Sequence, residues 1–283
     1  MINDTIKALR SQKGFKSKEL AHQIVSDSQL SKIEKGDKTL DAETFVSFLF
    51  RLNTNLEEFF HYSDNARVKA RLETTNYIGE ILRQRKIEKY PVAIEKMEYY
   101  YKKYGDDYFR HNSCLVKAMN TSNMQEAKRH LLPIKSYLNN TKVWLTYELK
   151  LLNNILISYS YEDAAELGEK ALHQISKNRA IHENSKITYS LLTNLAYSAL
   201  QHEQPIQACE YANKALNFPY STDFMYENLL LKIIHQIACY KLENSQFDKE
   251  YLTNLITGFK LMRLDDLHAQ ALNLIDTHNI PFN

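Results

Sequence analysis

Residues 17–36 read SKELAHQIVSDSQLSKIEKG, and this stretch carries the most specific structural signal in the chain. Its apolar and small side chains recur at helical spacing in two groups, Leu20, Ala21 and Ile24, then Leu30 and Ile33. The first group predicts a helix over residues 18–24 with Ser17 as its N-cap. The second predicts a helix over about residues 27–35 that stops at Gly36. A tight turn joins the two.

Stop signals divide residues 1–61 into five short helical segments, of which these two are the second and third. The other three are expected from about residue 6 to Gly14, over residues 42–52 after Asp41, and over residues 56–60 after a capping box of Thr54 and Glu57. Five helices in so short a stretch predict a compact module. We expect a linker at residues 62–65 and a second domain over residues 66–283.

The composition indicates an all-α protein. Only 6 glycines and 5 prolines occur among 283 residues, whereas turn-rich β folds and glycine-loop nucleotide folds need many more. The 36 basic and 34 acidic side chains give a net charge of +2, so any DNA-binding surface must be local. The cysteines, Cys114, Cys209 and Cys239, have no metal-ligand spacing and predict buried thiols in a reducing compartment. We expect no metal and no cofactor.

Residues 66–283 predict an array of helix pairs. Two segments forty-four residues apart carry small and apolar side chains at the same offsets, Ala164, Leu167, Gly168, Ala171 and Leu172, then Ala208, Tyr211, Ala212, Ala215 and Leu216. Pairs are expected over about residues 66–104, 107–138, 141–178, 185–218 and 222–262, with a last helix at 265–278. This period predicts a right-handed α-solenoid of tetratricopeptide-like helix pairs behind the N-terminal bundle.

The quoted stretch resembles the λ-repressor-like helix-turn-helix pattern, in which the second helix enters the DNA major groove. Ala21 is small where the two helices cross, and Leu30 and Ile33 anchor the second helix. The side chains expected to contact double-stranded DNA are Arg10, Lys16, Ser26, Asp27, Ser28, Gln29, Lys32, Lys35 and Lys38.

These side chains divide into phosphate and base contacts. The phosphate contacts are expected from Arg10, Lys16 and Lys38. Gln29 suits adenine, and Ser28 or Lys32 suits guanine or thymine edges. Asp27 has two interpretations: it accepts a hydrogen bond from cytosine, or it is a first-turn acid that the helix dipole favours.

The whole architecture resembles the Rgg regulators of Gram-positive bacteria, within the group of peptide-pheromone receptors that includes PlcR and PrgX. Residues 26–36 carry the only sequence motif specific to the family. The remainder of the chain resembles it in architecture alone, as a long run of tetratricopeptide-like helices. The resemblance implies a cytoplasmic, homodimeric, quorum-sensing transcription factor whose repeats bind a short signalling peptide on their concave face. Two departures stand out. Asp27 replaces a residue that is often basic in relatives, and residues 1–113 lack the cysteine needed for an intersubunit disulfide found in some of them.

The peptide site is expected on the first helices of successive repeats, where polar residues recur at i, i+4. The pairs are Lys150 and Asn154, Asn194 and Ser198, and Asn228 and Lys232. A carboxamide can donate to and accept from the backbone of an extended peptide, which suits a receptor. The alternative is that these polar residues lie on a solvated helix face. Apolar side chains from about Tyr226 onward, Leu229, Leu230, Ile233, Ile234 and Ile237, are expected to supply a dimer contact.

Other classes of protein lack support in the sequence. No zinc-protease, phosphate-loop or nucleophile-elbow motif occurs, so we expect no enzyme. The N-terminus is charged where a secretory signal would be apolar, so we expect that the protein is not exported by that route. No long apolar run occurs, so we expect no membrane partner. Two further hypotheses stay open. The repeats could bind another protein and sense no peptide, or the chain could be a repeat scaffold with a degenerate DNA module.

Overall fold

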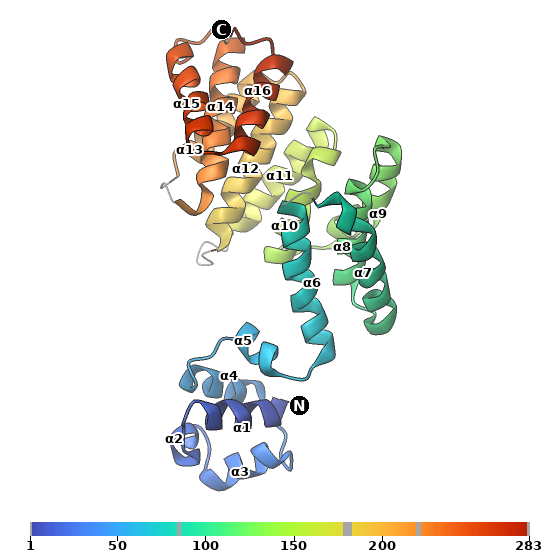
Figure 1. Cartoon of the computed structure of the whole chain (residues 1–283), viewed down its shortest axis with the longest axis vertical. Helices are drawn as coiled ribbons and strands as arrows, with labels where there is room; N and C mark the ends of the chain where they lie inside the picture. The colour runs from blue at the N-terminus through green and yellow to red at the C-terminus, as the bar shows by residue number, and fades with distance from the viewer. Residues whose placement is uncertain (1, 84–85, 178–182, 219–221, 282–283) are drawn as a thin grey trace. The chain divides into compact units, whose positions relative to one another are not determined.

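The computed structural model describes residues 2–83, 86–177, 183–218 and 222–281 (Figure 1). Throughout these ranges the regular structure is helical and no strand occurs, so the all-α expectation is confirmed. The chain forms two compact units, Met1–Ser122 and Asn123–Asn283. The division after Ser122 leaves three helices beyond residue 65 in the first unit, and the domain boundary expected at residues 62–65 stays a prediction.

The first unit begins with five short helices. They are α1 (Ile2–Gln12), α2 (Ser17–Ala21), α3 (Asp27–Lys35), α4 (Ala42–Arg51) and α5 (Leu56–Tyr62). Their apolar faces meet in one core of Ile6, Leu9, Leu20, Ala21, Leu30, Ile33, Phe48, Leu49, Leu52 and Phe59. The predicted five-helix module is therefore confirmed, including the start of α3 after Ser26 and its end at Gly36.

The predicted start of α2 is wrong by one residue. Lys16, and not Ser17, is the N-cap of α2, because its backbone N–H donates to the Glu19 carboxylate at 2.6 Å. This helix also ends at Ala21, short of Ile24, because Gln23 adopts a left-handed φ of 59° that no α-helix continues.

The capping box of α5 was predicted at Thr54 and Glu57, and the structure forms it one residue later, at Asn55 and Glu58. Asn55 accepts from the backbone N–H of Glu58 at 2.8 Å, and Glu58 accepts from that of Asn55 at 2.9 Å.

Three longer helices complete the first unit. They are α6 (Ala66–Arg83), α7 (Tyr90–Tyr104), which a short 3-10 turn at Ile87–Lys89 precedes, and α8 (Asp107–Met119). Pro91 lies in the first turn of α7, where its missing N–H donor costs no hydrogen bond, and Gly105 ends that helix with a φ of 62°. Consecutive helices pack, α6 on α7 and α7 on α8.

The second unit is a set of helix pairs in two layers (Figure 1). Its helices are α9 (Met124–Asn140), α10 (Thr146–Ile155), α11 (Tyr161–Lys177), α12 (Glu183–Gln201), α13 (Pro205–Leu216), α14 (Met225–Lys241), α15 (Lys249–Leu261) and α16 (Asp265–Thr277). The first helices of successive pairs contact one another in the order α10, α12, α14 and α16. Their second helices, α11 and α13, pack against α12 and α14. Helices occur at the positions predicted for each pair, but α8 and α9, expected to form one pair over residues 107–138, belong to different units.

Small residues set the spacing between α11 and α12. Ala164, Gly168 and Ala171 are buried, and a Cβ placed on Gly168 would lie 2.7 Å from both terminal methyl carbons of Leu195. That separation is below any real carbon contact, so a larger residue at this position would force the Leu195 side chain to move.

The apolar residues expected for a dimer contact are largely core. Leu230, Ile233, Ile234 and Ile237 are each at most 5% exposed, and only Leu229 is half-buried. They are buried because α12, α13 and α16 all pack on α14. The expectation that these side chains leave apolar surface free is wrong.

No helix within the described residues is both long enough and apolar enough to span a bilayer.

Candidate DNA-binding surface and ligand pocket

The start of α3 is held by a reciprocal capping box. The Ser26 hydroxyl accepts from the Gln29 backbone N–H at 3.2 Å, and the Gln29 side-chain oxygen accepts from the Ser26 backbone N–H at 3.3 Å. This arrangement fixes the Gln29 carboxamide beside the helix N-terminus while its NH2 group remains available as a donor. Asp27 is exposed in the first turn, where the helix dipole favours an acid.

Eight of the nine residues expected to contact DNA are solvent-exposed. They are Lys16, Ser26, Asp27, Ser28, Gln29, Lys32, Lys35 and Lys38. Those on α3 lie away from the buried Leu30 and Ile33, so one face of the helix anchors it and the other is free to enter a groove.

Arg10 differs from the other eight because it is engaged inside the module. Its Nε donates to Glu34 Oε1 at 2.5 Å and its Nη2 to Glu34 Oε2 at 3.0 Å, with 15% and 9% of the two side chains exposed. Nη1 donates to the Phe15 carbonyl at 2.9 Å. The hydrogen bond to Glu34 raises the pKa of Arg10. We therefore assign Arg10 a structural role in joining α1 to α3 and withdraw its phosphate contact.

Two further side chains that sequence reasoning missed hold the helix-turn-helix in place. Arg51 on α4 donates to the His22 carbonyl at 2.5 Å and the Glu19 carbonyl at 3.1 Å, which caps the C-terminal end of α2. Asn3 on α1 donates to the Ile33 carbonyl at 2.7 Å. All three acceptors are backbone carbonyls, which leave no residue-type signal in a sequence.

The six residues expected to bind a peptide have unequal exposure. Lys150 and Asn154 on α10 are exposed, and Asn194 on α12 and Lys232 on α14 are half-buried. Ser198 and Asn228 are only 3% and 6% exposed. Their helices are neighbours, as the repeat alignment required, but the structure does not bring the six side chains to one open surface.

Two of the expected peptide contacts are used within the protein. The Asn194 amide donates to both the backbone and the side-chain oxygen of Asn153, at 3.0 and 2.9 Å, and Asn153 donates to Ser190 at 2.9 Å. Asn228 donates to the Tyr189 hydroxyl at 2.5 Å. The residue on α10 that faces α12 is thus Asn153, the neighbour of the predicted Asn154.

A pocket of about 520 Å³ opens beside α14 in the second unit. Two of the predicted residues, Asn228 and Lys232, line it. The other lining residues are Leu216, His235, Gln236, Gln246, Asp248 and Tyr251. Gln236 shapes it by donating to the Gln246 carbonyl at 3.2 Å and accepting from the Asp248 backbone N–H at 2.8 Å. A larger pocket of about 740 Å³ lies in the first unit around Lys13, Glu58 and His61, away from all predicted site residues.

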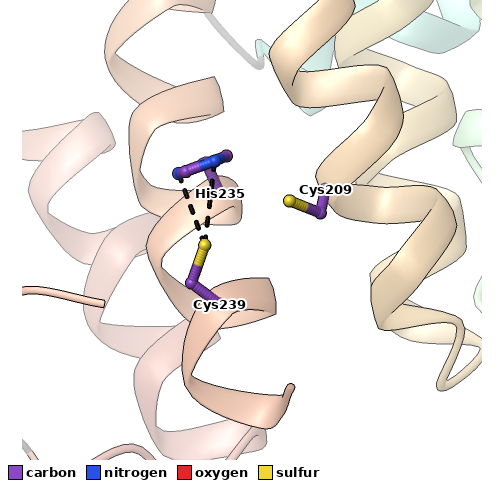
Figure 2. A group of neighbouring side chains, drawn as sticks. All are labelled: Cys209, His235 and Cys239. Carbon is purple, nitrogen blue, oxygen red and sulfur yellow. Dashed lines mark hydrogen bonds between the residues drawn. The ribbon is translucent and has the colours of Figure 1, made fainter. Parts of the chain in front are cut away.

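Cysteine and histidine side chains gather between α13 and α14 (Figure 2). The donor atoms of Cys209, His235 and Cys239 all lie within 4.8 Å of one another. Burial raises the pKa of the Cys239 thiol to about 12, and burial lowers the pKa of His235. The prediction of three buried thiols is right for Cys239 and wrong for Cys114 and Cys209, which are half-buried. Helix packing joins Cys209 and Cys239 although they lie far apart in the sequence.

Two family models match the sequence. Residues 6–59 match the helix-turn-helix family. Residues 111–272, more than half of the chain, match the family described as "HTH-type transcriptional regulator Rgg, C-terminal domain".

Solved structures with the same fold cover nearly the whole chain. The SHP pheromone receptor Rgg2 of Streptococcus dysgalactiae is 18% identical with a TM-score of 0.68, over 96% of this chain and 98% of that one. PlcR of Bacillus thuringiensis, crystallised with the peptide PapR7 and DNA, is 16% identical with a TM-score of 0.74, over 97% and 98%. PrgX in its cCF10 complex is 17% identical with a TM-score of 0.60, over 98% and 92%.

Proposed function

The chain belongs to the Rgg family of helix-turn-helix transcriptional regulators, and from that premise we propose that it binds DNA as a homodimer and changes transcription when a short peptide binds its second unit. It acts in the cytoplasm, where its DNA lies. The exposed polar face of α3 supports base readout through Gln29, Ser28 and Lys32, with Lys16 and Lys38 on phosphates.

The pocket beside α14 is the observation that carries the peptide proposal. Its volume falls in the usual range of ligand pockets, about 300–1,000 Å³. Its lining offers the half-buried cation Lys232, the anion Asp248 and the carboxamide of Gln236. Such a set matches a peptide, whose backbone needs donors and acceptors and whose C-terminal carboxylate needs a cation. PlcR was solved with a peptide and DNA, which gives the proposal a precedent in the same fold.

The expected peptide contacts can now be ranked. Lys232 is the first choice, because it lines the pocket and is half-buried. Asn154 and Lys150 extend the surface along α10. Asn228 lines the pocket, but its amide already donates to the Tyr189 hydroxyl. Asn194 is bonded to Asn153 and Ser198 is buried, so these three residues support the site without being proposed as direct peptide contacts.

The test begins with a library of short hydrophobic peptides added to the full chain. A specific peptide raises the melting temperature, because binding to the native state alone stabilises it. Calorimetric titration of that peptide into Lys232→Ala should show a loss of about 10-fold to 100-fold in affinity. Lys260→Ala, an exposed lysine on α15 outside the pocket, is the matched control.

Two results would redirect the proposal. If Lys232→Ala binds the peptide with wild-type affinity, the peptide binds outside this pocket. Failure of every peptide to stabilise the chain would favour the second candidate, in which the repeats bind a protein partner.

Dimerisation needs its own experiment. One module presents one recognition helix, so specific binding requires two modules on half-sites about 34 Å apart or a multiple of that distance. Sedimentation should show dimers at micromolar concentration or on DNA. Monomers in both conditions would exclude this arrangement.

A further inference from the structure

The cluster between α13 and α14 brings together three side chains that ligate soft metals. His235 and Cys239 lie one turn apart on α14 and therefore point to the same side of that helix. Cys209 projects toward them from α13, which packs directly on α14 (Figure 2). Two thiols and an imidazole from two helices converge on one point.

The separations are close to those that a metal requires. Around a tetrahedral ion with Zn–S of about 2.3 Å and Zn–N of about 2.0 Å, neighbouring donors stand about 3.5–3.8 Å apart. Cys239 Sγ already lies 3.7 Å from each ring nitrogen of His235, and no pair among the three donors exceeds 4.8 Å. The upper limit exceeds a metal-bound separation by about 1 Å. The His235 ring must also turn to direct one nitrogen lone pair at the ion, because Sγ lies equally far from both nitrogens.

The surroundings of the cluster suit a bound ion. Cys239 is fully buried, whereas Cys209 and His235 are half-buried and give an ion a way in. The Asn213 amide donates to Cys209 Sγ at 3.4 Å, and such an outer hydrogen bond orients and stabilises a thiolate ligand. The cluster itself contains no carboxylate, so hard cations such as calcium and magnesium are disfavoured.

We propose that Cys209, His235 and Cys239 form a site for one thiophilic metal ion, zinc(II) or copper(I). On binding, both thiols release their protons to solvent and the neutral imidazole contributes a lone pair. Zinc keeps a fourth, open position for water, while copper(I) accepts the three protein ligands alone. The ion links α13 to α14 and borders the pocket through His235. The proposal stands on these three residues and does not depend on peptide binding.

The experiment uses the reduced, metal-free full chain and adds one metal at a time. Cobalt(II) serves as a spectroscopic probe for zinc, because thiolate ligation produces a charge-transfer absorption that histidine sites on the surface cannot produce. We expect one cobalt per chain with this absorption, displacement by zinc, and a higher melting temperature with zinc. A parallel competition with a copper(I) chelator decides which of the two ions is held more tightly.

Variants assign the site. Cys209→Ser and His235→Gln, both at half-buried positions, should each lose at least about 100-fold in cobalt affinity, more than removal of an outer-shell partner typically costs. Cys114→Ser, the third cysteine in another unit, should bind like the wild type. The proposal is overturned if neither zinc nor copper(I) binds the reduced chain. It is also overturned if Cys209→Ser keeps both the affinity and the thiolate absorption.

Discussion

Arg10 and Glu34 form a two-pronged ion pair across the helix-turn-helix, with N–O distances of 2.5 and 3.0 Å. Both side chains are largely buried, so the pair is shielded from solvent. Removing either residue would leave the charge of the other buried without its counter-ion. The pair ties the first helix to the end of the recognition helix. The position of α3 therefore depends on this ion pair, to which we assign no contact with DNA.

Arg10→Ala should lower the free energy of unfolding by about 2–3 kcal/mol, because it leaves Glu34 buried without its cation. Urea denaturation measures this loss. At a temperature where the variant stays folded, its DNA affinity should keep the wild-type dependence on salt. Lys16→Ala, an exposed lysine, should instead reduce the slope of log affinity against log salt by about 0.9. A smaller slope of log affinity against log salt in Arg10→Ala would show that Arg10 contacts a DNA phosphate after all.

Gln29→Ala and Lys32→Ala should each weaken binding to the preferred site by about 1–3 kcal/mol, since each removes a contact to a base edge. The preferred site is obtained by selecting random duplexes with the wild-type chain. Affinity for unselected DNA is the internal control: it should hardly change in Gln29→Ala and fall slightly in Lys32→Ala. An unchanged preference in the double variant would remove the assignment of α3 as the recognition helix.

Gly168→Ala should destabilise the second unit by about 1–3 kcal/mol, although alanine favours helices by about 1 kcal/mol over glycine. The added methyl collides with Leu195, which is fully buried and has little room to move. Gly258→Ala on α15 is the matched control, because its Cβ would meet only Met262 Cε at an ordinary 3.9 Å. Thermal unfolding should show opposite shifts for the two variants. Equal shifts would mean that α11 and α12 are not in close contact.

Local signals in the sequence predicted most of the helix boundaries. Ser26 and Gly36 delimit α3, and Pro91 opens α7, because caps and prolines act within one turn of their own position. The repeat period also predicted where the helices of the second unit lie, since small residues such as Gly168 recur where helices cross. These features depend on neighbours in the sequence.

Interactions between helices were harder to predict. Neighbouring residues on a helix differ in direction by about 100°. A repeat alignment uncertain by one residue therefore selected Asn154 where the structure uses Asn153. Arg10 was assigned to phosphate because its partner Glu34 lies 24 residues away. The cluster of Cys209 with His235 and Cys239 depends on how far α13 is displaced along α14, which residue spacing does not reveal.

The adjacent asparagines of α10 provide a matched pair of variants. Asn153→Ala should lower the free energy of unfolding by about 1–3 kcal/mol, because it removes hydrogen bonds to Ser190 and Asn194. Asn154→Ala should leave it within about 0.5 kcal/mol, since that side chain is exposed. Denaturant titration of both variants checks this difference. Should Asn154→Ala prove the more destabilising, the register of α10 against α12 would be wrong.

Acid should destabilise the protein partly through His278, which is 5% exposed. Burial lowers its pKa from the ordinary 6.5, Lys241 lowers it further, and Glu203, with Oε1 3.8 Å from Nδ1, opposes the change. In the unfolded chain the histidine binds a proton near pH 6.5, while in the folded chain it does so only at lower pH. The free energy of unfolding therefore falls as pH drops below about 6.5, until the folded-state pKa is reached.

His278→Gln tests this assignment because glutamine keeps a polar side chain but does not titrate. Denaturant titrations at several pH values between about 7.5 and 5 give the slope of stability against pH for both proteins. The wild-type slope should exceed that of the variant by up to about 1.4 kcal/mol per pH unit, the effect of one proton. His111 and His235, whose pKa values burial also lowers, keep part of the acid sensitivity in both. Identical slopes would show that His278 is protonated in the folded chain as readily as in the unfolded one.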